Sequence, residues 1–291
     1  MGIVSLSCAT VIDWAMGPYV GKQTGEAALL WTLLANFKPG DVMIADRPYT
    51  SYFMIARQMQ LGADVVMRQH QTRHTDFRRG TRLGTRDHIV QWDRPARPTW
   101  MDEATYADMP ATLAMREVRA GGWTLVTSLV DAKSVSKMEL VDLYHSRWNV
   151  ELDFRSIKDV MQMDELRCNT AQMVRKEVAV HLLAYNLIRA VAGQAAELAG
   201  VAPRRMSFQA TLQTLTNFFH RLRECSRRKL PQLHANLLQA IAKLLLPVRP
   251  NRCEPRAVKR RPKPHRLLTK PRHIERARLD KRQQRILAAF A

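Results

Sequence analysis

The hydrophobic positions in the first quarter of the chain predict strands that alternate with helices. Apolar and polar residues alternate between residues 4 and 16, which is typical of one long strand or a tight pair of strands. Helices are predicted over Gly25–Phe37 and Ser51–Gln60. The short apolar runs Val42–Ala45 and Ala63–Met67 are typical of strands that are buried on both faces. This order of elements predicts an α/β fold.

The pattern changes after residue 67 and again after residue 135. Residues 68–123 lack helical periodicity and contain short runs of strand type among scattered proline and glycine, whereas helical periodicity returns over residues 136–246. Four prolines prevent a continuous helix between residue 251 and about residue 274. We therefore predict the first part of an α/β core over residues 1–72, a β-rich insertion over 73–134, the second part of the core over 135–200, a helical C-terminal region over 201–250 and a basic flexible tail over 251–291.

The charge of the chain indicates a polyanionic partner, of which DNA is the leading candidate. The 46 Lys and Arg residues outnumber the 26 Asp and Glu residues and give a net charge of +20. The last 41 residues hold 14 basic and three acidic residues, so they contribute 14 − 3 = +11. Residues 68–98 hold eight Arg and three Asp, or 8 − 3 = +5, and no Lys. This second region is either a surface that faces DNA or a solvated charged loop.

The sequence also argues against other classes of protein. Its most apolar stretch, residues 178–192, is interrupted by polar residues, so no transmembrane helix and no membrane partner are expected. The four cysteines are far apart and form no CxxC pair, which argues against a disulfide framework and a zinc knuckle. A reducing compartment fits this pattern, and we expect a cytoplasmic protein associated with the nucleoid.

The most informative stretch is YHSRWNVELDFRSIKDVM, residues 144–161. On a continuous helix, which advances about 100° per residue, Tyr144, Arg147, Glu151 and Lys158 fall on one narrow stripe. An apolar face borders this stripe, so the predicted helix packs on the core beside its polar residues. The alternative is a simple intrahelical ion pair between Arg147 and Glu151, worth only about 0.3–0.5 kcal/mol.

The same four residues match, residue for residue, the signature of a known family. The chain resembles the bacterial insertion-sequence transposases of the "insertion sequence four" family. The segment GDVMIADRPYTSYF resembles the strand and turn that carry the second catalytic aspartate of that family, here Asp46, and DFRRG and HLLAYNLIR also resemble family sequence. The resemblance implies an RNase H-like, retroviral-integrase-like core in which two aspartates and a glutamate bind two Mg²⁺ ions.

The resemblance assigns roles to individual residues. It implies that Asp46 and Glu151 are catalytic metal ligands and that Tyr144, Arg147 and Lys158 hold phosphates of the transposon-end DNA. Two hard cations held by carboxylates about 3.5–4 Å apart can activate water on one side of a phosphodiester and neutralise the leaving oxygen on the other. The implied reaction is metal-dependent hydrolysis and strand transfer at insertion-sequence ends.

Two further residues have alternative interpretations. Arg47 either contacts DNA or pairs with the neighbouring carboxylate of Asp46. Trp123, which begins a predicted strand 28 residues before Glu151, either stacks on an extruded base or is a core aromatic residue, and the core interpretation is favoured.

The sequence departs from the family pattern at its beginning. The resemblance places the first catalytic aspartate on a strand that precedes the opening strands of this chain. Asp13 is the only acidic residue in the opening region, and we interpret it as a structural or surface residue. We therefore expect a core that is incomplete at the N-terminus and an impaired Mg²⁺ site. The alternative function is a non-catalytic DNA-binding protein that dimerises with itself or with a full-length transposase and inhibits it.

Overall fold

The computed structural model describes residues 1–18, 25–247 and 270–289. The chain divides into two compact units, Met1–Leu246 and Pro247–Ala291. The second unit contains helix α9 (Arg272–Ala289), which begins close to the residue where the sequence allows a helix again. The predicted flexible tail falls mostly outside the described residues, because residues 251–269 are not among them.

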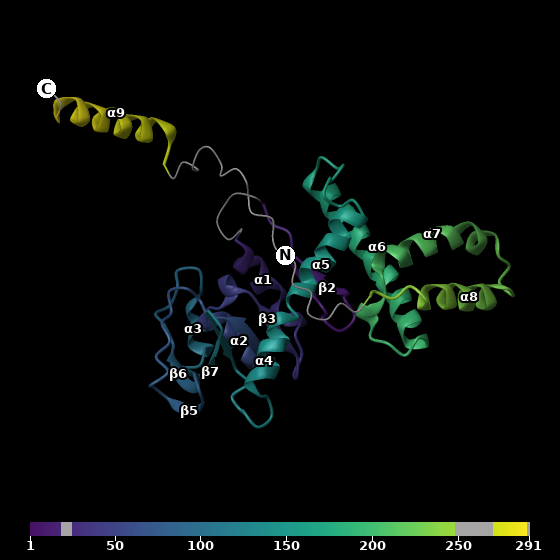
Figure 1. Ribbon diagram of the computed structural model, residues 1–291, viewed down its shortest axis with the longest axis horizontal. Helices are drawn as coiled ribbons and strands as arrows, with labels where there is room; N and C mark the ends of the chain where they lie inside the picture. The colour runs from purple at the N-terminus through teal and green to yellow at the C-terminus, as the bar shows by residue number, and fades with distance from the viewer. Residues whose placement is uncertain (19–24, 248–269, 290–291) are drawn as a thin grey trace. The chain divides into compact units, whose positions relative to one another are not determined.

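A mixed six-stranded sheet forms the centre of the first unit (Figure 1). Strand β3 pairs in parallel with β4, and all other neighbours in the order β3-β4-β8-β7-β6-β5 are antiparallel. The strands of the predicted β-rich insertion therefore extend the same sheet as the strands of the first core segment. The six strands are β3 (Val42–Ala45), β4 (Asp64–Arg68), β5 (Thr81–Gly84), β6 (Asp87–Asp93), β7 (Thr112–Ala120) and β8 (Trp123–Thr127).

Strand β3 is an edge strand, which corrects one expectation from the sequence. It pairs only with β4 among the described strands. Its apolar run predicted burial on both faces, but only the face of Met43 and Ala45 is buried, while on the other face Val42 is 37% exposed and Ile44 is half-buried. The opening residues form a separate two-stranded antiparallel sheet, β1 (Gly2–Val4) and β2 (Val11–Trp14), so the tight-pair alternative is confirmed. Asp13 has a structural role, because its Oδ2 accepts a hydrogen bond from Asn36 Nδ2 at 2.7 Å.

Helices pack on the sheet at positions that the sequence predicts well. Helix α2 (Tyr52–Gln60) begins after Ser51, whose side chain caps the backbone N–H of Met54, and it contributes Ile55 to the buried core beside Val65 of β4. Around this core lie helices α1 (Glu26–Leu33) and α3 (Glu103–Asp108), while α4 (Lys137–His145) supplies Leu140 and Tyr144 to a second cluster on β4 and β8.

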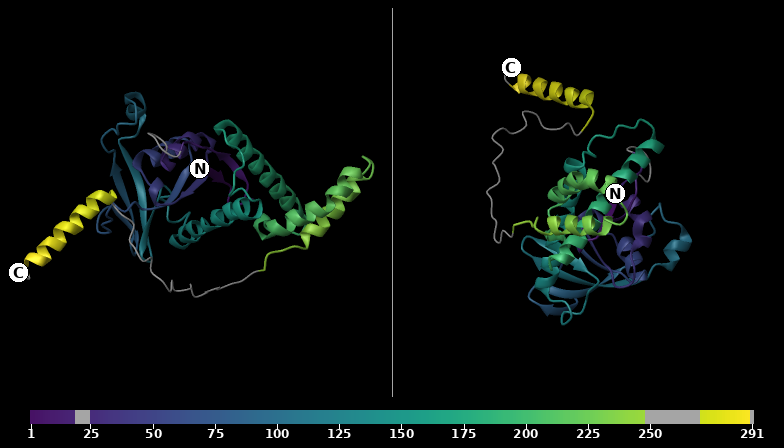
Figure 2. Two further views of the ribbon diagram at one scale, coloured as in Figure 1. Left: turned by 90° about the horizontal axis from the view of Figure 1, so that it is seen from above. Right: turned by 90° about the vertical axis from the view of Figure 1, so that its right-hand side faces the viewer.

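Three long helices form a separate group within the same unit, as the left view of Figure 2 shows. They are α6 (Ala171–Leu198), α7 (Phe208–Glu224) and α8 (Leu230–Ala242). Small residues of α6, including Ala192 and Ala195, pack against Leu237 and Ile241 of α8. Every helix in the described ranges is too short or too polar to cross a bilayer.

Candidate active site

A cavity of about 900 Å³ lies where β1, β2, β3 and helix α5 (Trp148–Arg155) come together. Four of the seven predicted site residues line it, namely Asp46, Arg147, Glu151 and Lys158. Asp46 and Glu151 are separated by 105 positions in the sequence (151 − 46), and both line this cavity. Their common role as metal ligands stays a prediction.

Asp46 is held by one of its two carboxylate oxygens. It follows β3 directly and precedes the short helix η2 (Arg47–Tyr49), where its Oδ1 accepts from the backbone N–H of Arg47 at 2.8 Å. The same oxygen accepts a longer hydrogen bond from Tyr144 Oη at 3.3 Å. No hydrogen bond to Oδ2 is found within the described residues, so this oxygen retains its full capacity to accept from water or to coordinate a cation.

The signature lies on three helical segments and not on one continuous helix. Helix α4 ends at His145, α5 begins at Trp148, and the chain changes to a π-helical turn, η3 (Ser156–Val160). Tyr144 does not line the cavity and is only 5% exposed. Arg147, Glu151 and Lys158 all reach the cavity.

Tyr144 contacts Asp46 through its hydroxyl group but does not line the cavity. Burial raises the pKa of Tyr144, and the negative charge of Asp46 raises it further, so the hydroxyl stays protonated and donates to the carboxylate. The predicted contact between Tyr144 and a DNA phosphate stays a prediction, and it requires the hydroxyl to leave Asp46.

Replacing Tyr144 with phenylalanine is expected to loosen Asp46 with little change in packing. The substitution keeps the ring and removes one hydrogen bond, which is worth about 0.5–1.5 kcal/mol in the free energy of unfolding. Urea denaturation of the Tyr144→Phe variant measures this loss. Tyr106→Phe is a suitable control, because the Tyr106 hydroxyl donates to the backbone oxygen of Pro95 and does not touch the cavity. A loss above about 3 kcal/mol would show that the ring packing had also changed.

The two cations of the cavity differ in their partners. Arg147 Nη1 lies 3.7 Å from Glu151 Oε1, and the two side chains are 19% and 52% exposed, so this pair contributes little to stability. Arg147 Nε is buried and has no partner within the described residues. Lys158 is exposed on η3. Both cations are therefore able to receive an anionic group that enters the cavity.

Arg47 and Trp123 lie outside the lining of the cavity. Arg47 Nη1 is 3.5 Å from Gln71 Oε1, and the described ion pairs include none between Arg47 and Asp46, so the pairing alternative is not observed. The Trp123 ring lies 5.3 Å from the Tyr144 ring and 5.9 Å from the His145 ring, measured between centroids. This position fits the core interpretation of Trp123, and its contact with a base stays a prediction.

Sequence reasoning missed two residues of the cavity, Glu26 and Tyr49. Tyr49 Oη donates to Glu26 Oε2 at 2.9 Å, and burial, followed by the charges of Glu26 and Asp46, raises the pKa of Tyr49. With Asp41, whose Oδ2 accepts from the backbone N–H of Lys38 at 2.8 Å, the lining holds four carboxylates, and Glu26 is the one that a tyrosine engages. The sequence gives no specific signal for Glu26, because it stands at the start of a predicted helix, where acidic residues are common.

The donor atoms of the cavity fit a hydrated divalent ion better than a complete two-ion site. Mg²⁺ commonly keeps several waters and takes one or two protein carboxylates together with substrate phosphates. Asp46 and Glu151 supply two carboxylates to the lining of the cavity. Nowhere in the described parts of the chain do three or more His, Cys, Asp or Glu side chains form a group that could hold a metal ion.

Comparisons with known proteins agree with the resemblance seen in the sequence. The model of the family described as "Transposase DDE domain" matches residues 18–187, a range that includes all the predicted site residues. The "Transposase InsG for insertion sequence element IS4" of Escherichia coli (strain K12) is 33% identical over 186 residues, which cover 62% of this chain. The matched region is 42% of that relative, so the chain spans about two fifths of its length.

Proposed function

We propose a function for this chain on the premise that it belongs to the transposase DDE domain family, whose model covers more than half of its 291 residues. The chain carries part of the catalytic centre of a DNA transposase that acts at insertion-sequence ends by phosphodiester hydrolysis and strand transfer. Its sheet and α4–α5 region form part of an RNase H-like core. The observation that carries this proposal is the shared cavity of Asp46, Glu151, Arg147 and Lys158.

Each residue has a distinct task in this proposal. Asp46 and Glu151 would hold Mg²⁺, which when bound would activate water and neutralise the leaving oxygen. Arg147 and Lys158 bind and orient the phosphate that enters the cavity. Tyr144 keeps the carboxylate of Asp46 in position through the hydrogen bond of 3.3 Å. DNA is the partner, together with a second copy of this chain or a full-length transposase, and the protein acts at the nucleoid.

We further propose that this chain alone has little or no strand-transfer activity. Four carboxylates line the cavity, but the described residues hold no group of three or more metal-ligating side chains, whereas the resemblance requires three ligands, and a missing ligand weakens metal binding. The favoured product of the purified chain with Mg²⁺ is therefore bound but uncut DNA. This outcome also suits the alternative function, a DNA-binding inhibitor of a full-length transposase.

Metal titration and DNA nicking distinguish these possibilities. We expect Asp46→Asn and Glu151→Gln each to weaken Mn²⁺ or Mg²⁺ binding at least about tenfold, whereas Asp159→Asn, an exposed change on η3, leaves it unaltered. If neither substitution changed the affinity for the metal ion, the proposed metal site would be refuted. Robust Mg²⁺-dependent nicking of plasmid DNA that Asp46→Ala abolishes would refute catalytic incompleteness. DNA binding without any metal binding would favour the inhibitor.

A further inference from the structure

We propose that the outward face of helix α6 pairs with the same face of α6 in a second copy of this chain, and that the two helices run antiparallel. This inference goes beyond the proposed function, which names a second copy as a partner but assigns no surface to it. Its basis is the side chains of α6, and it requires neither metal nor DNA. The observation that carries it is an exposed apolar stripe with opposite charges toward its two ends.

Helix α6 has two apolar faces, and the rest of the first unit covers one of them. The covered face includes Tyr185, whose hydroxyl donates to Ala9 O at 2.7 Å, and Ala192, which packs in a cluster with Leu237 of α8. Because a helix advances about 100° per residue, Leu183 and Leu187 each lie about 160° around the axis from Tyr185. They therefore belong to a second face on the opposite side of the helix.

The large side chains of this outward face are mostly exposed. Val180, Leu183 and Leu187 lie on successive turns and are 64%, 61% and 59% exposed, so no described element covers them. A single exposed leucine is ordinary on a protein surface, whereas apolar side chains aligned on one face of a helix are typical of an interaction site. The outward face of α6 is therefore a candidate surface for another helix.

The members of the outward face are spaced alternately four and three positions apart, which is the spacing of a helix that pairs lengthwise with another helix. They form a stripe about 27 Å long, because 18 steps of about 1.5 Å separate the first member from the last. All of them are exposed, and they are Lys176, Val180, Leu183, Leu187, Ala190 and Gln194. The centre of the stripe is apolar and its two ends are polar, which fixes the register of a pair.

The stripe is complementary to an antiparallel copy of itself. With the two-fold axis opposite residue 185, Leu183 of one copy opposes Leu187 of the other, and each such pair occurs twice. In the same register Lys176 opposes Gln194, whose side-chain oxygen can accept a hydrogen bond from the ammonium group. Apolar side chains therefore meet at the centre and polar side chains meet at both ends.

The charges of α6 favour the antiparallel direction over the parallel one. Lys176 is exposed near the N-terminal end of the helix, and Glu197 is exposed near its C-terminal end. They lie nine and twelve residues from the two-fold axis (185 − 176 and 197 − 185), so in an antiparallel pair they are about 4.5 Å apart along the axis. A parallel pair would instead place Lys176 beside Lys176 and Glu197 beside Glu197, which is repulsive.

Small residues beside the stripe allow two helices to approach each other closely. Ala179 lies on one side of Val180 and Leu183, and Ala184 lies on the other side. The distance between packed helix axes depends on the side chains at the contact, and small ones permit the short end of the usual range of about 8–10 Å. A single pair of helices of this length forms a small interface, so we expect a weak dimer with a Kd of about 1–100 μM.

Sedimentation equilibrium of the whole chain, in EDTA and without DNA, tests the proposal. We expect a reversible equilibrium between monomer and dimer, which Leu183→Lys and Leu187→Lys each weaken at least about tenfold. Because both side chains are exposed in the single chain, neither substitution should change its urea denaturation. Phe219→Lys, at a residue of α7 that is 57% exposed, is the matched control and should leave the equilibrium unchanged. A chain that stays monomeric up to about 100 μM, or a dimer that both α6 substitutions leave intact, would overturn the proposal.

Exchange of the two charges tests the direction of the helices. At low salt, Lys176→Glu and Glu197→Lys should each weaken the dimer about threefold to fivefold, because each removes two intermolecular ion pairs. The double variant restores opposite charges across the pair, so it should recover the affinity of the unchanged chain. Single variants without effect, or a double variant as weak as the single ones, would contradict the antiparallel pairing. Since the assay contains no metal or DNA, its failure is distinguishable from failure of the proposed catalytic site.

Discussion

Replacing Asp153 with alanine is expected to lower the free energy of unfolding of the first unit by about 3–5 kcal/mol, because it leaves buried charges without a partner. Asp153 is 1% exposed on α5, and Arg189 Nη2 and Arg204 Nη2 donate to its two oxygens at 3.1 and 2.9 Å. The Arg189 and Arg204 side chains are only 8% and 20% exposed. The substitution therefore removes a carboxylate that both of these largely desolvated guanidinium groups contact.

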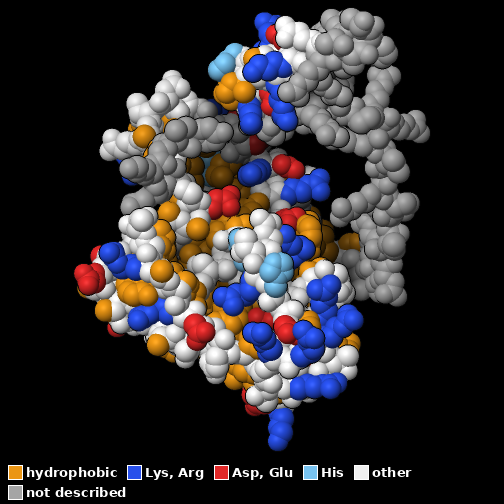
Figure 3. Space-filling view, turned by 90° about the vertical axis from the view of Figure 1, so that its left-hand side faces the viewer, with side chains coloured by type: hydrophobic (Ala, Val, Ile, Leu, Met, Phe, Trp, Pro, Cys, Tyr) orange, Lys and Arg blue, Asp and Glu red, His pale blue; other side chains and the backbone are white. Residues whose placement is uncertain are grey.

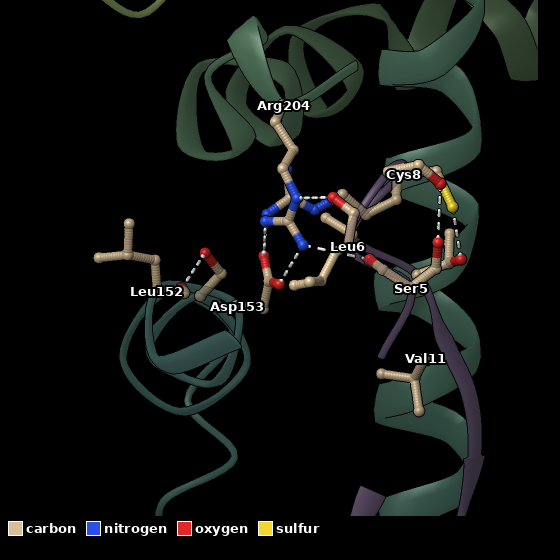
Figure 4. A network of polar contacts seen from close by, with 12 residues as sticks. Ser5, Leu6, Cys8, Val11, Leu152, Asp153 and Arg204 are labelled. Atoms are coloured by element: carbon tan, nitrogen blue, oxygen red, sulfur yellow. Dashed lines mark hydrogen bonds and ion pairs between the residues drawn. The ribbon is translucent and has the colours of Figure 1, made fainter. Parts of the chain in front are cut away.

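The effect extends beyond the local contact, because this network connects elements that are distant in the sequence. Arg204 links α5 to the carbonyl oxygens of Ser5 and Leu6 (Figure 4). Arg189 Nε donates to Tyr185 Oη at 3.0 Å on α6. Loss of Asp153 would thus release the segment after β1 as well as destabilise the fold. We expect faster hydrogen exchange in residues 2–14 of the variant.

Urea denaturation followed by circular dichroism measures the change, and the chain offers a matched control. Arg155 and Asp159 form an ion pair of 3.1 Å just beyond Asp153, but their side chains are 74% and 61% exposed. Asp159→Ala is therefore expected to change the free energy of unfolding by at most about 0.5 kcal/mol. If Asp153→Ala and Asp159→Ala lowered the free energy of unfolding equally, the contacts of Asp153 with Arg189 and Arg204 would not stabilise the fold as proposed.

The elements that could be predicted from sequence are those whose signal is local. The apolar runs of β3 and β4 and the cap at Ser51 of α2 lie within a few residues of the structure they specify. The resemblance also identified four residues that line one cavity, because the spacing of Arg147, Glu151 and Lys158 survives a break in the helix.

The features that sequence reasoning missed depend on contacts between distant segments. The place of β4 between β3 and β8 depends on a pairing whose residues Val66 and Thr127 are 61 positions apart (127 − 66). The helix break before Arg147 carries no proline or glycine, so no local signal marks it. Asp153 lies within the signature stretch, but its partners Arg189 and Arg204 come from other elements, and periodicity alone cannot identify such a centre.

The arginine-rich region of residues 68–98 divides into structural and exposed residues. Arg73 stacks over Trp92 at 3.6 Å, Arg94 donates to the backbone oxygens of Tyr106 and Met109, and Arg97 donates to that of Met101. Four exposed arginines lie on and around the β5–β6 hairpin, namely Arg78, Arg79, Arg82 and Arg86. Figure 3 shows one face of the molecule, on which Lys and Arg side chains gather in the lower part.

This division favours the interpretation of the region as a surface that faces DNA over its interpretation as a solvated charged loop. Asp76 partly neutralises Arg78 and Arg79, with N–O distances of 2.8 and 3.7 Å, and the hydrogen bonds from Arg78 lower the pKa of Asp76 to about 2. These arginines are nonetheless 89% and 84% exposed, and a charged loop that needed only solubility would not require four arginines and no lysine. We propose that the hairpin contacts DNA phosphates through their planar guanidinium groups.

Changing Arg78, Arg79, Arg82 and Arg86 together to glutamine is expected to reduce the salt dependence of DNA binding. Each phosphate contact adds about 0.9 to the slope of log affinity against log salt, so the slope should fall by about 3.6 if all four arginines contact phosphates. Fluorescence anisotropy with a labelled duplex at several salt concentrations measures it. The control variant removes the same charge around the α7–α8 connection, at Arg223, Arg227, Arg228 and Lys229. We expect it to change the slope by less than about 1. Equal changes in the two variants would show that the protein attracts DNA through its net charge of +20 and that the hairpin is a solvated loop.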